Sequence, residues 1–293
     1  MKINSLFEKS IWMPGWGELA LGSLLLALVS GFILIPFIPA GDKTFVALSE
    51  LIGSGFFGHF IHSFHSWSGD VFLITTFIHI IEYLYKKTFL SYQLVSWFWL
   101  VLLLVFSVLT VFSGFLSLAS QESLSAVQIF TSILSRIPIV GDFLILFLFG
   151  DLQSASIYLH HASTFSIITV VLVYIHLQRI KSERYAFIYT AAVLTFLAVL
   201  FPARIGHAPD TVNQVVKGPW YFIGLQEMLG WMPVWLAGLV IPGGLLVLFG
   251  FLPNFRWKSQ PIIWLIILFI LFYLIEAVIG QFLRGSGWQL LLR

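Results

Sequence analysis

Seven of the eight histidines lie in or beside two apolar stretches, residues 57–85 and 155–178. An imidazole in such a stretch needs a partner, because burial of a polar ring without one is costly. Its chemistry is metal ligation, proton exchange or a hydrogen bond to a neighbouring carbonyl group. For any single histidine, a hydrogen bond to a carbonyl group is the alternative to metal ligation. The spacing of several histidines is what distinguishes these two roles.

Four of these histidines recur at matching intervals. His65 and His79 are fourteen residues apart, which in a helix places them within about 40° of one face and roughly 21 Å apart along the axis. His161 and His176 are fifteen residues apart, about 60° off one face and roughly 22 Å apart. If both segments cross a bilayer in the same direction, His65 faces His161 and His79 faces His176.

Neutral imidazoles paired on facing helices are strong axial ligands for haem iron. The spacing therefore predicts two stacked bis-histidine haem b groups, His65 with His161 near the outer side and His79 with His176 near the inner side. The chain has no cysteine, which excludes disulfides, cysteine-ligated iron–sulfur clusters and covalently attached haem.

Two further histidines lie next to the expected ligands. His160 is sixteen residues from His176, which turns it about 160° away from that residue, so His161 is the better ligand. His62 lies one turn before His65. We expect it to contact a haem propionate or a water molecule, the alternative being a plain polar residue of the helix end.

The composition places these histidines in a membrane. The chain is 59% hydrophobic and 10% charged, which predicts an all-α integral membrane protein. A bilayer requires about 20 apolar residues per helix. The qualifying runs predict seven transmembrane helices, a four-helix haem-binding bundle followed by three helices: 19–38, 57–85, 94–118, 155–178, 185–202, 233–252 and 261–283.

The rest of the chain sets domains and orientation. Residues 122–150 are broken by Pro138 and Gly141, which predicts one or two short helices at the membrane surface. The charged stretch 179–185 divides the chain into domains at 1–183 and 184–293. Nine basic residues lie on the side of the N-terminus and six on the other, which favours a cytoplasmic N-terminus. A net charge of +2 without a basic patch gives no indication of nucleic-acid binding.

The sequence resembles the cytochrome b family of quinol:cytochrome c and plastocyanin oxidoreductases, especially a fused chloroplast-type cytochrome b plus subunit IV. The stretch SFHSWSGDVFLITTFIHIIEYL (63–84) is similar to the family's second helix, and SRIPIVGDFLILFLFG (135–150) to its surface segment before the fourth helix. The resemblance implies a four-helix dihaem domain over 1–183, a three-helix subunit-IV-like domain with a quinol-site loop over 184–293, and a bacterial cytoplasmic (inner) membrane.

Glycines form part of this resemblance. Gly17 and Gly31 are fourteen residues apart, as in the family where haem edges approach the backbone. Gly114 matches the second glycine of the equivalent pair in the third span, and Leu100 stands where the first would be. The resemblance implies that the three glycines are cofactor-binding positions.

The stretch KGPWYFIGLQEMLGW (217–231) resembles the family's quinol-oxidation loop, which reads P-E-W-Y in most members. Pro219 replaces the glutamate, which in the family accepts a proton from quinol. We expect Glu227 to take that role, the alternative being a surface carboxylate. Trp220 and Tyr221 are expected to wall the quinol pocket with Pro219, and interfacial anchoring is their alternative role.

Other departures concern charge. Arginines that the family places beside the haem ligands are replaced by His62, Ser66 and Glu82. Fewer cations disfavour the reduced haem, which would suit a low-potential quinol such as menaquinol. Asp70 and Glu276 are carboxylates within spans, expected either on a proton path or as buried hydrogen-bonded acids.

The resemblance implies that quinol is oxidised near the outer face and that electrons cross the membrane through the two haems. A Rieske iron–sulfur protein, a c-type cytochrome or both would be partners, within a homodimeric, lipid-embedded complex. One alternative is a non-bifurcating dihaem conduit between the quinone pool and a multihaem cytochrome. Another is a haem-free structural or transport subunit.

Overall fold

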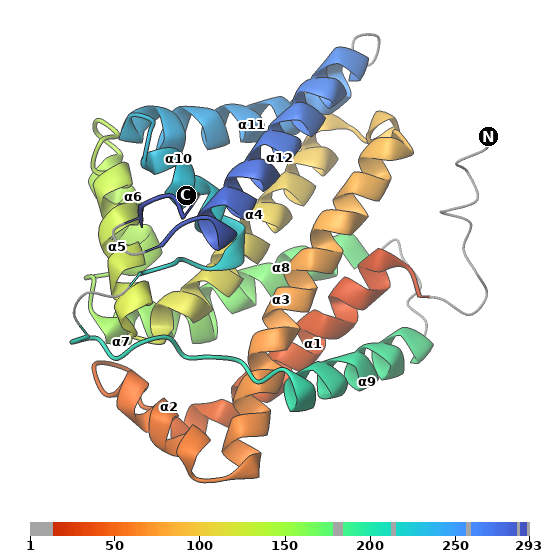
Figure 1. Ribbon diagram of the computed structural model, residues 1–293. Helices are drawn as coiled ribbons and strands as arrows, with labels where there is room; N and C mark the ends of the chain where they lie inside the picture. Colours follow the sequence, from red (N-terminus) through yellow and green to blue (C-terminus); the bar gives the residue numbers. More distant parts are fainter. Residues whose placement is uncertain (1–13, 178–183, 212–214, 256–258, 286–287, 292–293) are drawn as a thin grey trace. The chain divides into compact units, whose positions relative to one another are not determined.

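The computed structural model describes residues 14–177, 184–211, 215–255, 259–285 and 288–291. Over these residues the chain is helical (Figure 1), with one isolated β-bridge between Arg284 and Leu290. The helices form two compact units. The first comprises Met1–Pro39, Val46–Lys86 and Val170–Arg204, and the second Ala40–Phe45, Lys87–Thr169 and Ile205–Arg293.

The first unit is built around three helices that pack against one another: α1 (Trp16–Leu34), α3 (Phe56–Tyr85) and α9 (Arg184–Leu200). Small residues allow close approach, since a Cβ on Gly22 would lie 2.9 Å from Oγ1 of Thr190. The buried hydroxyl of Ser30 donates to the carbonyl of Leu26 in its own helix, so hydroxyls here are satisfied without breaking the packing. The end of α8 (Ser166–Leu177) also belongs to this unit.

The second unit contains α4 (Leu94–Ser117), α5 (Gln121–Leu134), α6 (Gly141–Phe149), α7 (Ser154–Leu159), the π-helical η4 (His160–Phe165), α10 (Trp220–Leu229), the π-helical η5 (Leu236–Val240), α11 (Ile241–Gly250) and α12 (Ser259–Phe282). Helix α4 packs against α7 and η4, and α10 packs against α12. The rings of Phe112, Phe130 and Phe222, with centroids 4.6 to 5.0 Å apart, join α4, α5 and α10.

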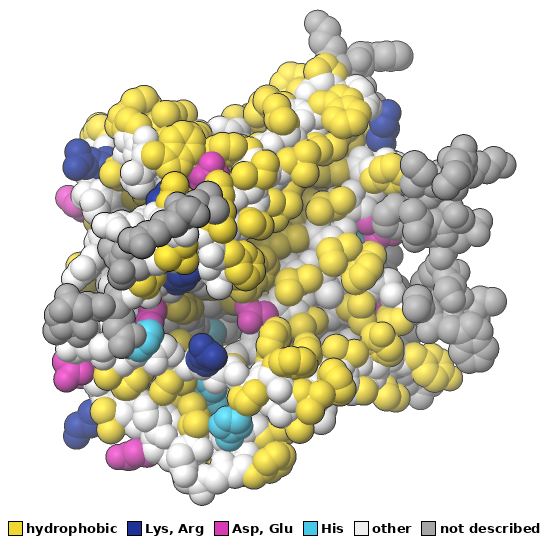
Figure 2. Space-filling view, in the orientation of Figure 1, with side chains coloured by type: hydrophobic (Ala, Val, Ile, Leu, Met, Phe, Trp, Pro, Cys, Tyr) yellow, Lys and Arg dark blue, Asp and Glu magenta, His cyan; other side chains and the backbone are white. Residues whose placement is uncertain are grey.

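Four helical segments among the described residues are long and apolar enough to cross a membrane: Trp16–Phe37, Leu94–Ser117, Ser154–Leu177 and Ser259–Phe282. Helix α12 exposes Trp264, Leu268 and Phe282 by 61%, 64% and 69%, and hydrophobic side chains cover much of the face seen in Figure 2. Such a surface suits contact with lipid rather than water. The all-α membrane class predicted from composition is therefore confirmed.

The other three predicted spans are helical but fall outside this set. Helix α3 is 30 residues long and carries histidines and carboxylates, while α9 and η5–α11 give apolar helices of only 10 to 17 residues. The surface segment forms two short helices, α5 and α6. The sequence reasoning missed α2 (Thr44–Gly53) and the helical state of α10 within the quinol-like loop.

The domain boundary expected at 183/184 borders residues outside the described part. Contacts group α9 with α1 and α3 rather than with the helices that follow it.

Candidate functional site

His65 lies on α3 and is oriented by α1. Its Nδ1 is 3.0 Å from the carbonyl oxygen of Ala27 and 3.1 Å from Oγ of Ser30. A carbonyl oxygen only accepts hydrogen bonds, so Nδ1 carries the proton and Nε2 is the basic nitrogen that is available to a metal. A Cβ on Gly31 would lie 2.9 Å from Cε1 of the ring. The glycine therefore makes room for the imidazole.

His161 is oriented in the same way by α4. Its Nδ1 is 3.0 Å from the carbonyl oxygen of Thr110 and 3.3 Å from Oγ of Ser113, and a Cβ on Gly114 would lie 2.8 Å from Cε1. In both cases the carbonyl lies four residues before the glycine and the serine one residue before it. The chain thus fixes two imidazoles in the tautomer of a metal ligand by the same arrangement.

The three glycines of the resemblance lie against the rings of the expected ligands. The family pattern implied that Gly17, Gly31 and Gly114 leave room for the edge of a haem. In the structure all three face a histidine ring, because a Cβ on Gly17 would lie 2.9 Å from Cε1 of His79. The missing side chains let the expected ligands approach the neighbouring helix closely.

His79 and His176 face each other within the first unit. Their ring centroids are 6.4 Å apart, with an angle of 68° between the ring planes. A ligating imidazole nitrogen lies about 2 Å from its metal and the ring centre about 1 Å further, so two rings on opposite sides of one ion are about 6 Å apart. The separation fits an iron atom held between the two imidazoles. This is the pair that the spacing predicted for the inner haem.

A π-helical turn explains the unequal spacing of the two histidine pairs. Residues His160–Phe165 form a π-helix, and Oγ of Ser166 donates to the carbonyl of His161 five residues earlier. A π-turn accommodates one extra residue in an α-helix. The fifteen residues from His161 to His176 therefore cover nearly the rotation and rise of fourteen α-helical residues, the interval between His65 and His79. The angle of about 60° between His161 and His176, which assumed a uniform α-helix, is therefore larger than a helix with this π-turn gives.

The neighbouring histidines have other surroundings. Nδ1 of His160 is 3.3 Å from the hydroxyl of Thr164 and its ring stacks on Phe165, so it contacts its own helix. His62 is 4% exposed and its Nδ1 has no hydrogen-bond partner among the described residues. This burial disagrees with a plain polar helix-end residue and leaves a polar partner, such as a propionate, as the remaining expectation.

The quinol-like loop leads into helix α10. Pro219 is the residue before this helix, Trp220 is 41% exposed, and Tyr221 is 8% exposed. The carbonyl of Tyr221 accepts a hydrogen bond of 2.6 Å from the hydroxyl of Tyr273 on α12. The amide of Gln226 accepts from Gly218 N and donates to the carbonyl of Val216. These bonds fix the loop against the start of the helix.

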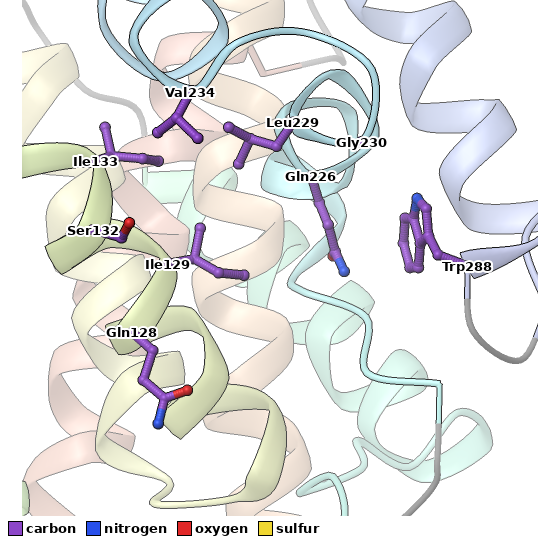
Figure 3. Close-up of a pocket in the computed structure, with 9 residues that line it drawn as sticks. All are labelled: Gln128, Ile129, Ser132, Ile133, Gln226, Leu229, Gly230, Val234 and Trp288. Carbon is purple, nitrogen blue, oxygen red and sulfur yellow. The ribbon is translucent and has the colours of Figure 1, made fainter.

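An open cavity of about 540 Å³ lies between α5 and α10 (Figure 3). Apolar side chains line most of it, with Gln128, Ser132 and Gln226 supplying polar groups and the Trp288 ring at one side. The full lining is Gln128, Ile129, Ser132, Ile133, Gln226, Leu229, Gly230, Val234 and Trp288. The expected wall residues Pro219, Trp220 and Tyr221 are not among these nine, so the cavity adjoins the later part of α10.

Glu227 is 2% exposed and has cationic and polar partners. Its carboxylate accepts from Nε and NH2 of Arg284 and, at 2.9 Å, from Nε1 of Trp288. The hydrogen bond to Glu227 raises the pKa of Arg284. These contacts occupy both carboxylate oxygens of Glu227, which disfavours the residue as a free proton acceptor. On α12, Glu276 is 7% exposed and accepts a hydrogen bond of 3.2 Å from Nε1 of Trp231. Of the two roles expected for Glu276, this contact fits the buried, hydrogen-bonded carboxyl group.

A second acidic pair escaped the sequence reasoning. The carboxylate of Glu122, at the start of α5, accepts from Nδ1 and from the backbone N–H of His207, the latter at 2.9 Å. Burial raises the pKa of Glu122, but hydrogen bonds from His207 and Ser120 outweigh it and leave this pKa below its ordinary value. Gly206, with φ of +84°, makes the turn that brings His207 there. The sequence offered one signal for this pair: Glu122 is an acid just after a predicted span, and His207 is the one histidine outside the two histidine-rich segments.

Comparison with known proteins agrees with this geometry. A family model described as Cytochrome b/b6/petB matches residues 8–184. Cytochrome b of Acanthamoeba castellanii is 24% identical over 280 residues, covering 83% of this chain and 73% of that protein. Cytochrome b of Solanum tuberosum is 23% identical and covers 88% and 77%.

A solved structure described as a hyperthermophilic respiratory Complex III has the same fold. Its TM-score is 0.72 at 18% identity, covering 90% of this chain and 82% of the solved one. The family model covers more than half of the chain and spans the four histidines expected as haem ligands. The protein therefore belongs to the cytochrome b family.

Proposed function

We propose that the chain is a dihaem cytochrome b that carries electrons across a membrane between a quinol and other carriers. Membership of the family implies b-type haem, which supplies one-electron redox chemistry when bound. The observation that carries the proposal is the His79–His176 pair, whose ring separation of 6.4 Å fits one iron atom. His65 and His161, each with Nδ1 hydrogen-bonded to a carbonyl oxygen, complete the set predicted by spacing.

The proposed histidine ligands would bind the haem iron and exclude oxygen from it. The two histidine pairs would hold the haems, and haem ligated by two imidazoles would supply electron transfer rather than oxygen binding. Carbonyl groups hold Nδ1 of His65 and His161, so these rings need not reorient when the charge of the centre changes. The glycines at 17, 31 and 114 permit the short helix separations on which this orientation depends.

We assign seven membrane crossings to the chain. Helix α3, with 30 residues, is about 45 Å long and can span a bilayer despite its polar side chains. Helices α9 and η5–α11 are apolar, and tilt or local thinning of the bilayer would accommodate their length. The excess of basic residues at the N-terminal side supports a cytoplasmic N-terminus in a bacterial inner membrane.

The cavity between α5 and α10 is the quinol site that we propose. Its volume of about 540 Å³ falls in the range of small-molecule sites, about 300–1,000 Å³. Ile129, Ile133 and Leu229 offer an apolar surface to a ring and isoprenoid chain, and Gln128 and Ser132 offer groups that can hydrogen-bond a quinol hydroxyl. Gln226, which lines the cavity, also bonds to Gly218 and Val216 and so ties the segment before Pro219 to α10.

The Glu122–His207 pair is the better candidate for taking up quinol protons. Glu122 precedes Ile129 by seven residues, which puts it within about 20° of the same face of α5 and about 10 Å along the helix. His207 is 43% exposed and can pass a proton to water. Glu227 could act only if Arg284 released it. This pair would then replace the carboxylate that Pro219 displaces from the loop.

The fold shared with a respiratory Complex III supports assembly into a larger complex with other subunits. A Rieske iron–sulfur protein that co-purifies with the chain would support electron bifurcation, within the homodimeric complex that we propose. Only c-type cytochromes co-purifying would favour a non-bifurcating conduit. Menaquinol is the proposed donor, because Glu82 stands where the family has cations.

The test is a reduced-minus-oxidised haem b spectrum and a potentiometric titration of the purified complex. Two b-type components are expected, with one lost in His79→Ala and the other in His161→Ala. His160→Ala is the matched control, because its Nδ1 contacts Thr164 and its ring stacks on Phe165, both in the same helical segment. Absence of b-type haem, or equal effects of His160→Ala and His161→Ala, would overturn the proposal.

A further inference from the structure

His79 differs from the two histidines whose Nδ1 atoms face carbonyl groups. Its own Nδ1 is buried and has no hydrogen-bond partner among the described residues. A carboxylate oxygen of Glu82, one turn further along α3, lies 3.9 Å from it. That distance is about 1 Å longer than a hydrogen bond, and a change in the side-chain rotamer of Glu82 can close it.

The carboxylate of Glu82 is paired with a lysine on the same helix. Its other oxygen accepts a hydrogen bond of 2.5 Å from Nζ of Lys86. The Glu82 side chain is 16% exposed and that of Lys86 43% exposed. The carboxylate is thus more sheltered from water than the ammonium group that it pairs with, so water screens its field on the partly buried His79 ring less. Tyr83, with a ring centroid 4.5 Å from that of His79, and His176 cover other sides of the imidazole.

We propose that Glu82 is a positioning residue for His79, accepting the Nδ1–H hydrogen bond and setting the redox potential of the inner site. A carboxylate on the outer nitrogen of a ligating histidine fixes the ring and makes it a stronger donor to the metal. A stronger donor and a nearby negative charge both stabilise the oxidised state over the reduced one. This inference rests on the proposed function, because it requires haem between His79 and His176.

The consequence is an asymmetry between the two sites. His65 and His161 receive neutral carbonyl acceptors, whereas His79 receives a charged one. The inner site should therefore be harder to reduce than it would be with a neutral partner. An arginine or other cation near this ligand would do the opposite, so Glu82 adapts the chain to a donor of low potential.

The experiment is a potentiometric titration of the purified complex carrying Glu82→Gln, which keeps the size of the side chain and removes its charge. One of the two b components should become easier to reduce by about tenfold in the reduction equilibrium, equivalent to about 59 mV for one electron. The other should not move. His161→Ala, which removes the outer component, identifies the shifted one as the inner site.

Two further variants separate positioning from general structural damage. Glu82→Asp, which keeps the charge, should restore most of the wild-type potential. Lys86→Gln, which removes the competing cation, should make the same component harder to reduce, with a smaller change because Lys86 is more exposed. The ferric electron paramagnetic resonance signal of the inner site should also shift in Glu82→Gln, since the donor strength of His79 changes.

The outcomes distinguish this inference from the proposed function. Two wild-type b components with neither shifted by Glu82→Gln or Lys86→Gln overturn the role of Glu82 and leave the dihaem assignment intact. An equal shift of both components also overturns it, because a general field effect does not act through His79. Absence of b-type haem in the wild type refutes the proposed function itself.

Discussion

Gly31→Ala tests the orientation of His65 by a single methyl group. The added Cβ would lie 2.9 Å from Cε1 and 3.4 Å from Nδ1 of His65. Carbon atoms in contact are about 3.5–4.0 Å apart, so the ring has to move by at least about 0.6 Å. Nδ1 starts 3.0 Å from the carbonyl oxygen of Ala27. A shift of this size takes it past about 3.2 Å, the usual limit of an N–H···O bond.

The cost combines two effects. A lost hydrogen bond is worth about 1 kcal/mol, and an extra methyl group in a packed interior costs about 1–3 kcal/mol. The sum, about 2–4 kcal/mol, falls on the ligated arrangement of His65. Since about 1.4 kcal/mol corresponds to a tenfold change in an equilibrium constant, retention of the haem bound by His65 should weaken by roughly 30-fold to several hundred-fold.

The assay is haem content per polypeptide, together with a redox titration to identify the component affected. Gly31→Ala should lose or weaken one b component and spare the other. Gly243→Ala on α11 is the control, because a Cβ there meets no atom within 4 Å, and it should keep both components. Full haem content with wild-type potentials in Gly31→Ala would refute the claim that the glycine makes room for the ligand ring.

Three further predictions concern stability. Arg284→Met leaves the Glu227 carboxylate, 2% exposed, without its cation and should lower the free energy of unfolding by about 3–5 kcal/mol. In a thermal unfolding assay the double variant with Glu227→Gln should recover most of this loss. Equal losses of stability in the single and double variants would contradict the ion pair. The pKa of Glu122 is lowered in the folded state from its ordinary value of 4.5. The ionised carboxylate therefore stabilises the fold above about that pH, and this contribution is lost as the pH falls through the lowered pKa. Glu122→Gln should abolish this part of the acid dependence of the unfolding temperature. The buried hydroxyls of Thr110 and Thr169 are 2.7 Å apart, so Thr110→Val and Thr169→Val should each cost about 1–3 kcal/mol while the double variant costs less than their sum; strict additivity would show that the hydroxyls do not interact.

The sequence alone predicts the helices and the ligand candidates well, because both depend on local information. Apolar length marks a helix for the bilayer, and each of the seven predicted runs is helical in the structure. Residue type and interval select His65, His79, His161 and His176 as ligand candidates, and the rings of His79 and His176 lie with their centroids 6.4 Å apart. The sequence also shows that Pro219 and Glu82 depart from the family pattern, since this requires only a comparison of residue types.

Only the tertiary structure decided what each of these residues contacts. The carbonyl groups of Ala27 and Thr110 orient the rings of His65 and His161, yet every residue has a carbonyl group, so no sequence pattern marks them. The π-turn at His160–Phe165, which brings the two histidine intervals into agreement, packs against α4, and no residue type in it marks such a turn. A uniform helical period could not reveal it.

The acidic residues show the same limit. Glu227 pairs with Arg284 across 57 residues and Glu122 with His207 across 85 residues. The sequence shows that a carboxylate lies in an apolar region and therefore needs a partner. Which partner it finds is determined by how distant helices and loops pack, because hydrogen bonds and ion pairs depend on distance in space and not on distance along the chain.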